Sequence, residues 1–135
     1  MAVQAWRAGG LGFLALYAHD VLPASFAIPA GLGDIAIGVT APWVLARLLR
    51  SPGFAGSGTF VLWNVLGILD LVEALTLGAL GSLLATGAAG EITTAPMATL
   101  PLLLIPIYLV PIFLALHAAA LLQARAIAKR LRDGS

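Results

Sequence analysis

The chain has 135 residues, of which 61% are hydrophobic and only 10% are charged, with a net charge of +1. A soluble domain carries about 25% charged residues, because water must solvate its surface. This composition therefore excludes an ordinary water-soluble globule and predicts a surface that faces lipid. The chain has no cysteine and two histidines, which excludes disulfides, cysteine-ligated metal and a multi-histidine metal site within one protomer.

The apolar runs are expected to be transmembrane helices, because lipid leaves backbone groups no partner outside a helix and a span needs about 20 residues. The first predicted span covers residues 8–26, with His19 and Asp20 near its outer end. Prolines break the chain after it. The second span covers residues 28–49 and ends in a Ser-Pro-Gly turn.

The third predicted span covers residues 59–84, and a small polar loop separates it from the fourth span, over residues 97–123. No strand-like alternation is present. The sequence therefore predicts a single all-α domain over residues 1–135, built as a bundle of four transmembrane helices.

The basic residues fall on one side of these predicted spans. They are Arg7 before the first span, Arg47 and Arg50 after the second, and Arg125, Lys129, Arg130 and Arg132 after the fourth. Loops rich in Lys and Arg stay in the cytoplasm. We therefore expect a multi-pass protein of a bacterial inner membrane with both termini in the cytoplasm.

Besides Asp20 at the outer end of the first span, three acids lie inside the predicted spans, where an Asp costs roughly 2.5–3.5 kcal/mol at mid-helix. Asp34 lies in the second span, and Asp70 and Glu73 lie near the middle of the third. One interpretation is an intramembrane site that binds a cation or relays protons. The alternative is that protonated acids hydrogen-bond across helices and hold the bundle together.

The remaining polar residues have a structural role or serve as ligands; they are Asn64, His117, His19 and Asp20. Asn64 and His117 lie at similar depth on the third and fourth spans, so a hydrogen bond between them is expected. His117 is alternatively an axial haem ligand. His19 lies near the opposite membrane face, so a haem would need one histidine from each of two subunits.

Four prolines are expected to kink helices, because proline removes a backbone donor and clashes with the preceding turn. Pro42 lies in the second span, and Pro101, Pro106 and Pro111 lie in the fourth. The kinked fourth span either lines a cavity and moves as a gate, or is bent statically for packing.

Three motifs carry a resemblance to known sequences. They are Pro29-Ala30-Gly31-Leu32-Gly33-Asp34, then Trp63-Asn64 with Gly67 and Asp70, then Ile105-Pro106 with Val110-Pro111 and His117. The pattern resembles small bacterial integral membrane proteins of uncharacterised function. It implies that this chain is a shortened version of longer ones with further spans before it, and that Asp34, Asn64, Asp70 and His117 are the positions to test. The resemblance implies no substrate, cofactor or catalytic residue.

These observations favour a small proton- or cation-linked transporter or channel. The alternative is a non-enzymatic accessory subunit of a larger membrane complex that holds haem, quinone or lipid. We expect no enzymatic activity, because no phosphate loop, dinucleotide fingerprint, catalytic triad or zinc motif is present. Glycine and alanine faces favour a homo-oligomer or partner membrane subunits, and no binding to nucleic acid is expected.

Overall fold

The computed structural model describes the backbone of residues 1–133, and the side chains in that range apart from residues 52 and 131–133. This part of the chain is helical and contains no strand. The main helices are η1 (Ala2–Gly10, 3₁₀), α1 (Leu11–Ala18), α2 (Ala24–Arg50), α3 (Gly58–Leu83) and α4 (Val110–Asp133). Short turns are η2 (Pro52–Gly56), η3 (Ala95–Ala98) and the π-helical η4 (Ile105–Leu109).

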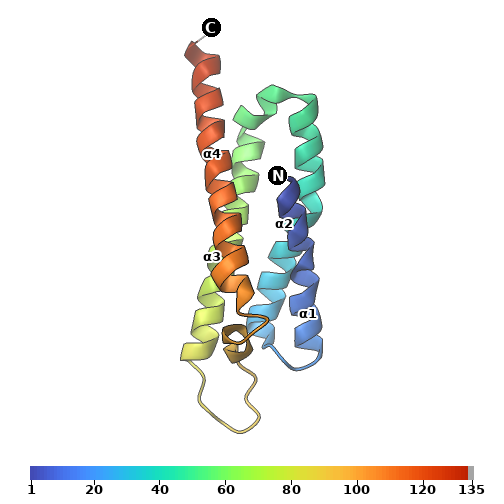
Figure 1. Cartoon of the computed structure of the whole chain (residues 1–135), viewed down its shortest axis with the longest axis vertical. Coiled ribbons are helices and arrows are strands. Elements are labelled where there is room, and N and C mark those ends of the chain that lie inside the picture. The colour runs from blue at the N-terminus through green and yellow to red at the C-terminus, as the bar shows by residue number, and fades with distance from the viewer. Residues whose placement is uncertain (134–135) are drawn as a thin grey trace.

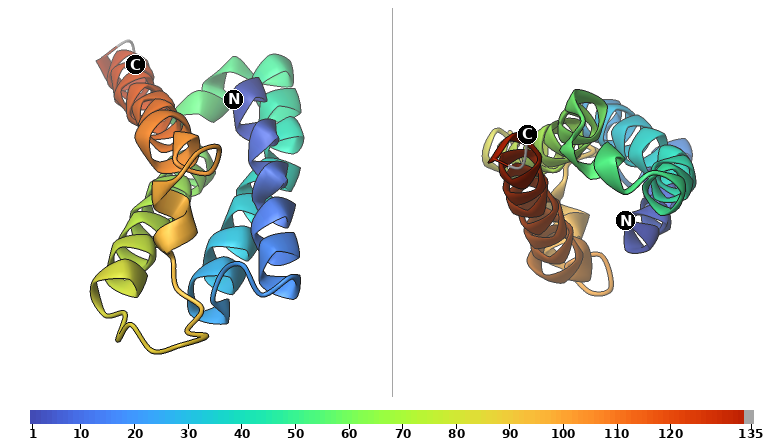
Figure 2. Two further views of the ribbon diagram at one scale, coloured as in Figure 1. Left: turned by 60° about the horizontal axis from the view of Figure 1, so that its bottom comes forward. Right: turned by 90° about the horizontal axis from the view of Figure 1, so that it is seen from above.

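The helices form an up-and-down bundle (Figure 1). η1 continues into α1 and runs toward the end of the molecule that carries the long loop. α2 returns to the opposite end, α3 comes back, and α4 runs up to the C-terminus. Seen along the bundle, α1 and α4 lie at the two ends of a curved row, with α2 and α3 between them (Figure 2).

Three of these helices are long and apolar enough to cross a membrane: Ala24–Arg50, Gly58–Leu83 and Ile105–Arg130. They indicate a multi-pass membrane protein. The N-terminal segment consists of nine residues of 3₁₀ helix followed by eight of α-helix, which is shorter than the other three. The four-span count and the orientation in the membrane therefore stay predictions.

The first two predicted spans meet at a different point from the one expected. Helix α1 ends at Ala18, and the chain turns through Asp20, whose φ of 55° is left-handed. Pro23 is the extended N-cap residue of α2, so Phe26 belongs to α2 and not to the first span. Pro23 lacks an N–H and would clash with the preceding helical turn, which favours an early turn. Pro29, also expected to break the chain, instead lies inside α2. The helix predicted over 59–84 is present as α3, with each end shifted by one residue.

The fourth predicted span, 97–123, is corrected most. Residues 99–103 form a bend and turns, η4 follows, and α4 begins at Val110. Pro101 lies in the turns and therefore precedes the helix rather than kinking it. Pro106 lies in η4 and Pro111 lies near the start of α4, both within the continuous helical stretch Ile105–Arg130. Kinks at these two prolines stay a prediction. Pro42 lies inside α2, as predicted.

The loop between α3 and η3 is tied down at two points. Glu91 accepts hydrogen bonds from the Thr86 and Gly87 amides at 2.9 and 2.8 Å. The hydrogen bond from the Thr86 amide, with a smaller contribution from the Gly87 amide, holds the pKa of Glu91 below its ordinary value. Buried Thr94 donates to the Gly78 carbonyl at 2.6 Å and so holds the chain against α3.

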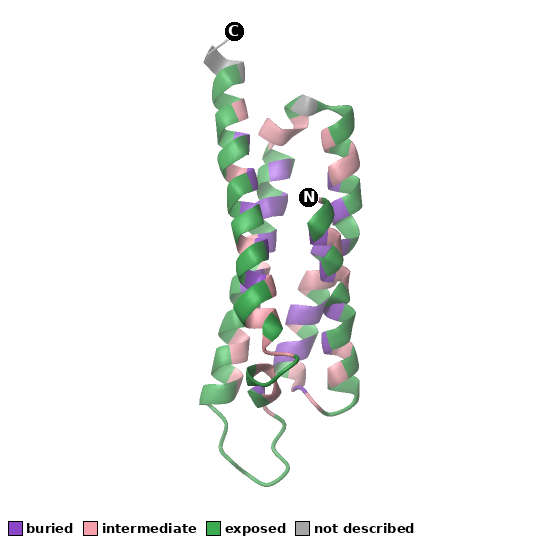
Figure 3. Ribbon diagram, viewed as in Figure 1, coloured by how far each residue is buried: buried purple, intermediate pink, exposed green. Residues whose placement is uncertain are grey.

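Buried side chains follow the inner faces of the helices, while the long loop is exposed (Figure 3). They form three apolar groups, represented by Trp63 near the C-terminal end of the bundle, Phe26 near the loop end, and Phe113 between α3 and α4. A set of buried polar residues lies in the middle of the bundle: Gln4, Arg7, Asn64 and His117.

Candidate functional site

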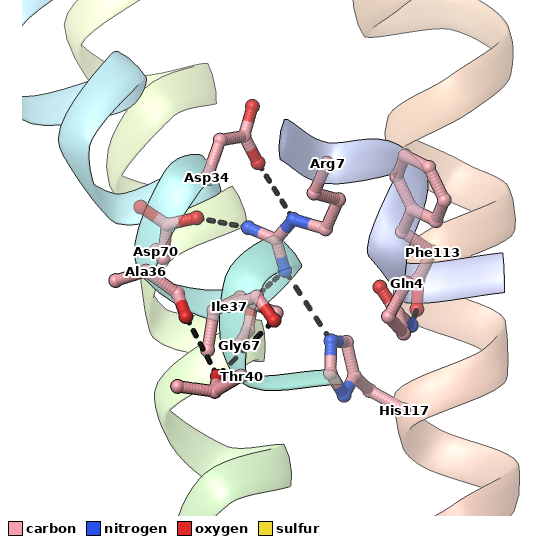
Figure 4. A network of polar contacts seen from close by, with 10 residues as sticks. All are labelled: Gln4, Arg7, Asp34, Ala36, Ile37, Thr40, Gly67, Asp70, Phe113 and His117. Atoms are coloured by element: carbon pink, nitrogen blue, oxygen red, sulfur yellow. Dashed lines mark hydrogen bonds and ion pairs between the residues drawn. The ribbon is translucent and has the colours of Figure 1, made fainter. Parts of the chain in front are cut away.

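The candidate site is centred on Arg7, whose side chain is fully buried (Figure 4). Its Nε donates to Asp34 Oδ1 at 2.6 Å, and Nη2 donates to Asp70 Oδ2. Nη1 lies 3.3 Å from both the Gly67 carbonyl oxygen and His117 Nε2. One guanidinium from η1 thus joins α2, α3 and α4, and every one of its nitrogens has a partner. We call Arg7, Asp34, Asp70 and His117 the arginine cluster.

Small residues bring η1 close enough to α2 for this arrangement. A Cβ at Gly38 would lie 2.8 Å from the Arg7 carbonyl carbon and 3.0 Å from Ala8 Cα. A Cβ at Gly10 would lie 2.6 Å from Asp34 Cβ. Non-bonded heavy atoms at these distances overlap, so any side chain at these positions would push η1 and Arg7 away from α2.

The hydrogen bonds of His117 define its tautomer. Arginine only donates, so His117 Nε2 accepts from Arg7, and Nδ1 carries the proton that it donates to Asn64 Oδ1 at 2.9 Å. Asn64 Nδ2 then donates to the Phe60 carbonyl at 2.8 Å. The imidazole lies directly over Gly67, where a Cβ would overlap it. The hydrogen bond expected between His117 and Asn64 is therefore present.

Aromatic side chains surround the arginine cluster. The Trp63 ring centroid lies 5.4 Å from that of His117, and its Nε1 donates to Thr40 Oγ1 at 2.8 Å. The Arg7 guanidinium carbon lies 5.9 Å from the Phe113 ring centroid, within range of a cation–π contact.

Asp34 and Asp70, two of the three acids predicted to share a site, do converge, and their side chains are only 19% and 12% exposed. Glu73 does not join them and is exposed on α3. A helix turns about 100° per residue, so each three-residue step falls about 60° short of a full turn. Two such steps carry Glu73 roughly 120° away from Gly67, which faces His117.

The other predicted polar residues divide into two pairs. His19 and Asp20 are exposed in the turn between α1 and α2 and make no side-chain hydrogen bond within the described residues. Asn64 and His117 are fully buried. Because both ring nitrogens of His117 are engaged inside the bundle, this side chain does not fit the role of a haem ligand.

Two cavities meet at Asp34. The loop-side cavity, of about 300 Å³, is lined by Phe26, Ala74, Gly78, Met97 and Pro106, among others. The lateral slot, of about 180 Å³, lies between η1 and α4 and is lined by Trp6, Gly9, Leu109 and Phe113, among others. Phe13, Asp34, Leu71, Ile105 and Val110 line both. Asp34 Oδ2 has no hydrogen-bond partner among the described residues, whereas Oδ1 is held by Arg7.

Residues 1–125 match the family described as a domain of unknown function, DUF8737. The chain belongs to this family. No curated protein and no solved structure matches it. The stretch that defines DUF8737 contains the whole arginine cluster and the lining of both cavities around Asp34. The match confirms that the chain belongs to an uncharacterised domain family; the motif pattern and the bacterial origin stay predictions.

The prediction placed Arg7 among the basic residues outside the membrane, and this was wrong. Arg7 lies in the bundle because its charge is paired by Asp34 and Asp70. The other described basic side chains lie toward the end of the molecule that holds the C-terminus: Arg47, Arg50, Arg125, Lys129 and Arg130. The side chain of Arg132 lies outside the described residues.

A signal for Arg7 was available in the charge balance. The predicted spans contained several acids and, apart from Arg47 at the end of the second span, no Lys or Arg, and charges inside a membrane are usually paired. Gln4, one helical turn before Arg7, is also buried and donates to the Phe113 carbonyl at 3.5 Å. Within the described residues, no group of three or more His, Asp or Glu side chains is arranged to hold a metal ion.

Proposed function

We propose that this protein is a small proton-linked membrane transporter whose proton-exchange site is the arginine cluster. The observation that supports this proposal is the charge count. One buried arginine is paired with two acids, and His117 is a neutral acceptor toward Arg7. With both acids ionised, the cluster carries a formal charge of −1 inside the bundle.

A purely structural ion pair would need only one acid. Charges removed from water are costly unless they are compensated, so the surplus negative charge makes the cluster a place to bind one proton or one monovalent cation. That proton belongs to the coupled group rather than to one carboxylate. Two charge states that differ by one proton are the minimum that proton-linked transport requires.

Access to the cluster supports exchange rather than permanent occupancy. Asp34 lines both cavities, and one of its oxygens has no partner among the described residues. The loop-side cavity is bounded by η3, η4 and the turns between them, where the chain is not regular α-helix. π-helical turns often occur at functional positions. A change in this segment would alter access to Asp34 without moving Arg7.

Hydrated metal ions are less suited to this site than protons are. Ca²⁺ and Mg²⁺ take six or more oxygen ligands, whereas the loop-side cavity presents mainly carbon, with Ser82 and Thr94 as further polar side chains. Ser82 and Thr94 already hydrogen-bond to each other at 3.0 Å.

Proton flux into liposomes tests the proposal. A potassium diffusion potential would drive protons inward, and an enclosed pH-sensitive dye would report them. Asp34→Asn and Asp70→Asn should each lower the protein-dependent flux at least tenfold. Glu73→Gln, one turn along α3 on the exposed surface, is the matched control and should retain it. Flux that is absent, or unchanged by both Asn substitutions, would rule the proposal out.

The proposal includes four membrane crossings in a bacterial inner membrane, with the basic end in the cytoplasm, in accordance with the positive-inside rule. Because the chain has no cysteine, single cysteines can be labelled without background. An impermeant maleimide added to intact cells should label Ala88→Cys and not Ser51→Cys. The reverse pattern would invert the topology. The exposed small-residue surfaces support assembly as a homo-oligomer or with partner subunits.

The apolar lining of the loop-side cavity also favours a second candidate, a non-enzymatic accessory subunit that holds a quinone or lipid. Such a subunit should purify with a stoichiometric apolar molecule that solvent extraction releases. Its occupancy should not depend on Asp34. A His117-ligated haem would give a Soret band, whereas the engaged ring nitrogens of His117 lead us to expect a colourless preparation.

A further inference from the structure

We propose that the loop-side cavity and the lateral slot together bind an organic cation with an apolar body, whose charge is placed at Asp34. This inference rests on the proposed function, because it names the substrate class of the same site.

The sign of the ligand's charge follows from which polar atoms are uncommitted. Four of the five N–H groups of Arg7 are taken by Asp34, Asp70, Gly67 and His117, and its single positive charge is outweighed by the two carboxylates. Asp34 lines both cavities, and its Oδ2, an acceptor, has no hydrogen-bond partner among the described residues. An ionised carboxylate in a cluster of formal charge −1 attracts a cation and repels an anion.

The apolar and aromatic lining of the loop-side cavity predicts that the body of the ligand is apolar. Phe13 and Phe26 line the loop-side cavity with their rings edge to face at 5.4 Å. Aromatic faces bind organic cations through their quadrupole as well as through apolar contact. Leu71, Met97 and Val110 complete an apolar surface. This surface would pack against hydrocarbon groups of a ligand, but it offers no polar atoms to replace the water around a hydrated ion. The volume of about 300 Å³ reaches the lower end of the range for small-molecule pockets.

The route of entry is lateral. The slot lies between η1 and α4, the two ends of the curved row of helices (Figure 2). Trp6 lines it and is 73% exposed on the outside of the bundle. In a bilayer this side faces lipid rather than water, so a ligand would reach Asp34 from the membrane. An apolar-bodied cation partitions into that environment, whereas a hydrated ion does not.

Proton and ligand would compete. Either one brings the arginine cluster to a formal charge of zero, and both together would leave it at +1. Binding of the organic cation should therefore release a proton, and acidification should release the cation. This competition is the physical basis for exchanging one against the other across the membrane.

Tetraphenylphosphonium and tetraphenylborate give a matched test, because the two ions share a shape and differ in the sign of their charge. Equilibrium binding to the detergent-purified full chain would be measured with each ion. Tetraphenylphosphonium should bind, more weakly as pH falls, and Asp34→Asn should weaken it at least tenfold. Tetraphenylborate should not show Asp34-dependent binding. Glu73→Gln should bind tetraphenylphosphonium as the native chain does.

The outcomes separate this inference from the proposed function. Asp34-dependent proton flux without tetraphenylphosphonium binding would overturn the substrate class and leave the transporter proposal intact. Binding that is equal for both ions, or insensitive to Asp34→Asn, would show partitioning into the apolar walls and would also overturn it. Because Asp34→Asn leaves one acid for Arg7, the variant should fold, and its thermal unfolding in detergent checks that it does.

Discussion

The arginine cluster and the loop-side cavity are neighbours that share Asp34, yet they are built in opposite ways. In the cluster every Arg7 nitrogen and both His117 nitrogens have partners, and glycines at positions 38 and 67 permit backbone and ring to touch. Around the cavity the walls are apolar, and the chain before α4 forms turns rather than regular helix. The comparison shows a hydrogen-bonded charged site beside an apolar chamber with an irregular wall, which is the combination that our proposal of controlled access to Asp34 requires.

The largest expected effect comes from leaving Arg7 without acids. In the double variant Asp34→Asn, Asp70→Asn the guanidinium stays buried and loses both counter-charges. Breaking a buried ion pair from one side costs about 3–5 kcal/mol. We expect a loss of unfolding free energy of that order, measured by unfolding in mixed micelles.

Adding Arg7→Met to that double variant removes the last charge and provides its control. Replacing an entire buried charge network with uncharged residues is often neutral, so stability should largely return while proton flux does not. A double variant as stable as either single Asn variant would contradict the ion-pair assignment.

The contrast in packing can be tested with one chemical change made twice on α3. Gly67→Ala would place a Cβ on the His117 ring, whereas at Gly78 the nearest atom, Phe26 Cε2, is 3.4 Å away in ordinary contact. Overpacking costs about 1–3 kcal/mol, while alanine in an unobstructed helix gains roughly 0.5–1 kcal/mol over glycine. Gly67→Ala should therefore destabilise the chain and Gly78→Ala should not. Equal effects would show that the two regions are packed alike.

A smaller effect is expected at the edge of the arginine cluster. Trp63→Phe keeps a ring beside His117 and removes the hydrogen bond from Nε1 to Thr40 Oγ1. A single neutral hydrogen bond contributes about 1 kcal/mol net, so the unfolding free energy should fall by about that much. Proton flux should persist, because no charge changes. Loss of flux with intact folding would assign the indole a role beyond packing.

The smallest effect belongs to the exposed loop, far from both regions. Hydrogen bonds from the Thr86 amide and, to a smaller extent, the Gly87 amide hold the pKa of Glu91 below its ordinary value of 4.5. Because the folded-state pKa is depressed, this stabilisation is present above the unfolded-state pKa and is lost as pH falls through the folded-state value. The amide signals of these two residues should titrate with a midpoint below pH 4.5 in nuclear magnetic resonance spectra. Glu91→Gln should abolish that titration and leave tetraphenylphosphonium binding unchanged.

Prediction from the sequence succeeded where one interaction dominated. The third span was placed to within one residue, because a run of apolar side chains without proline leaves lipid and helix as the only solution. The pairing of Asp34 with Asp70 followed from the cost of charge in an apolar medium. Prediction failed for Glu73. Residues spaced by three were taken to share one helix face, but each such step rotates the side chain about 60° around the helix. It also failed between residues 97 and 103, where short 3₁₀ helix and turns around Pro101 replace the expected regular helix.

The amino-acid sequence by itself determined the solvent, the helical class and the demand that buried acids find partners, because these depend on composition and on local backbone chemistry. Only the tertiary structure decided that the partner is Arg7, 27 residues from Asp34 and 63 from Asp70. That choice depends on how closely η1 packs against glycines of α2. Whether an arginine near a helix end lies in water or inside the bundle is a question of distance between helices, which no local pattern encodes.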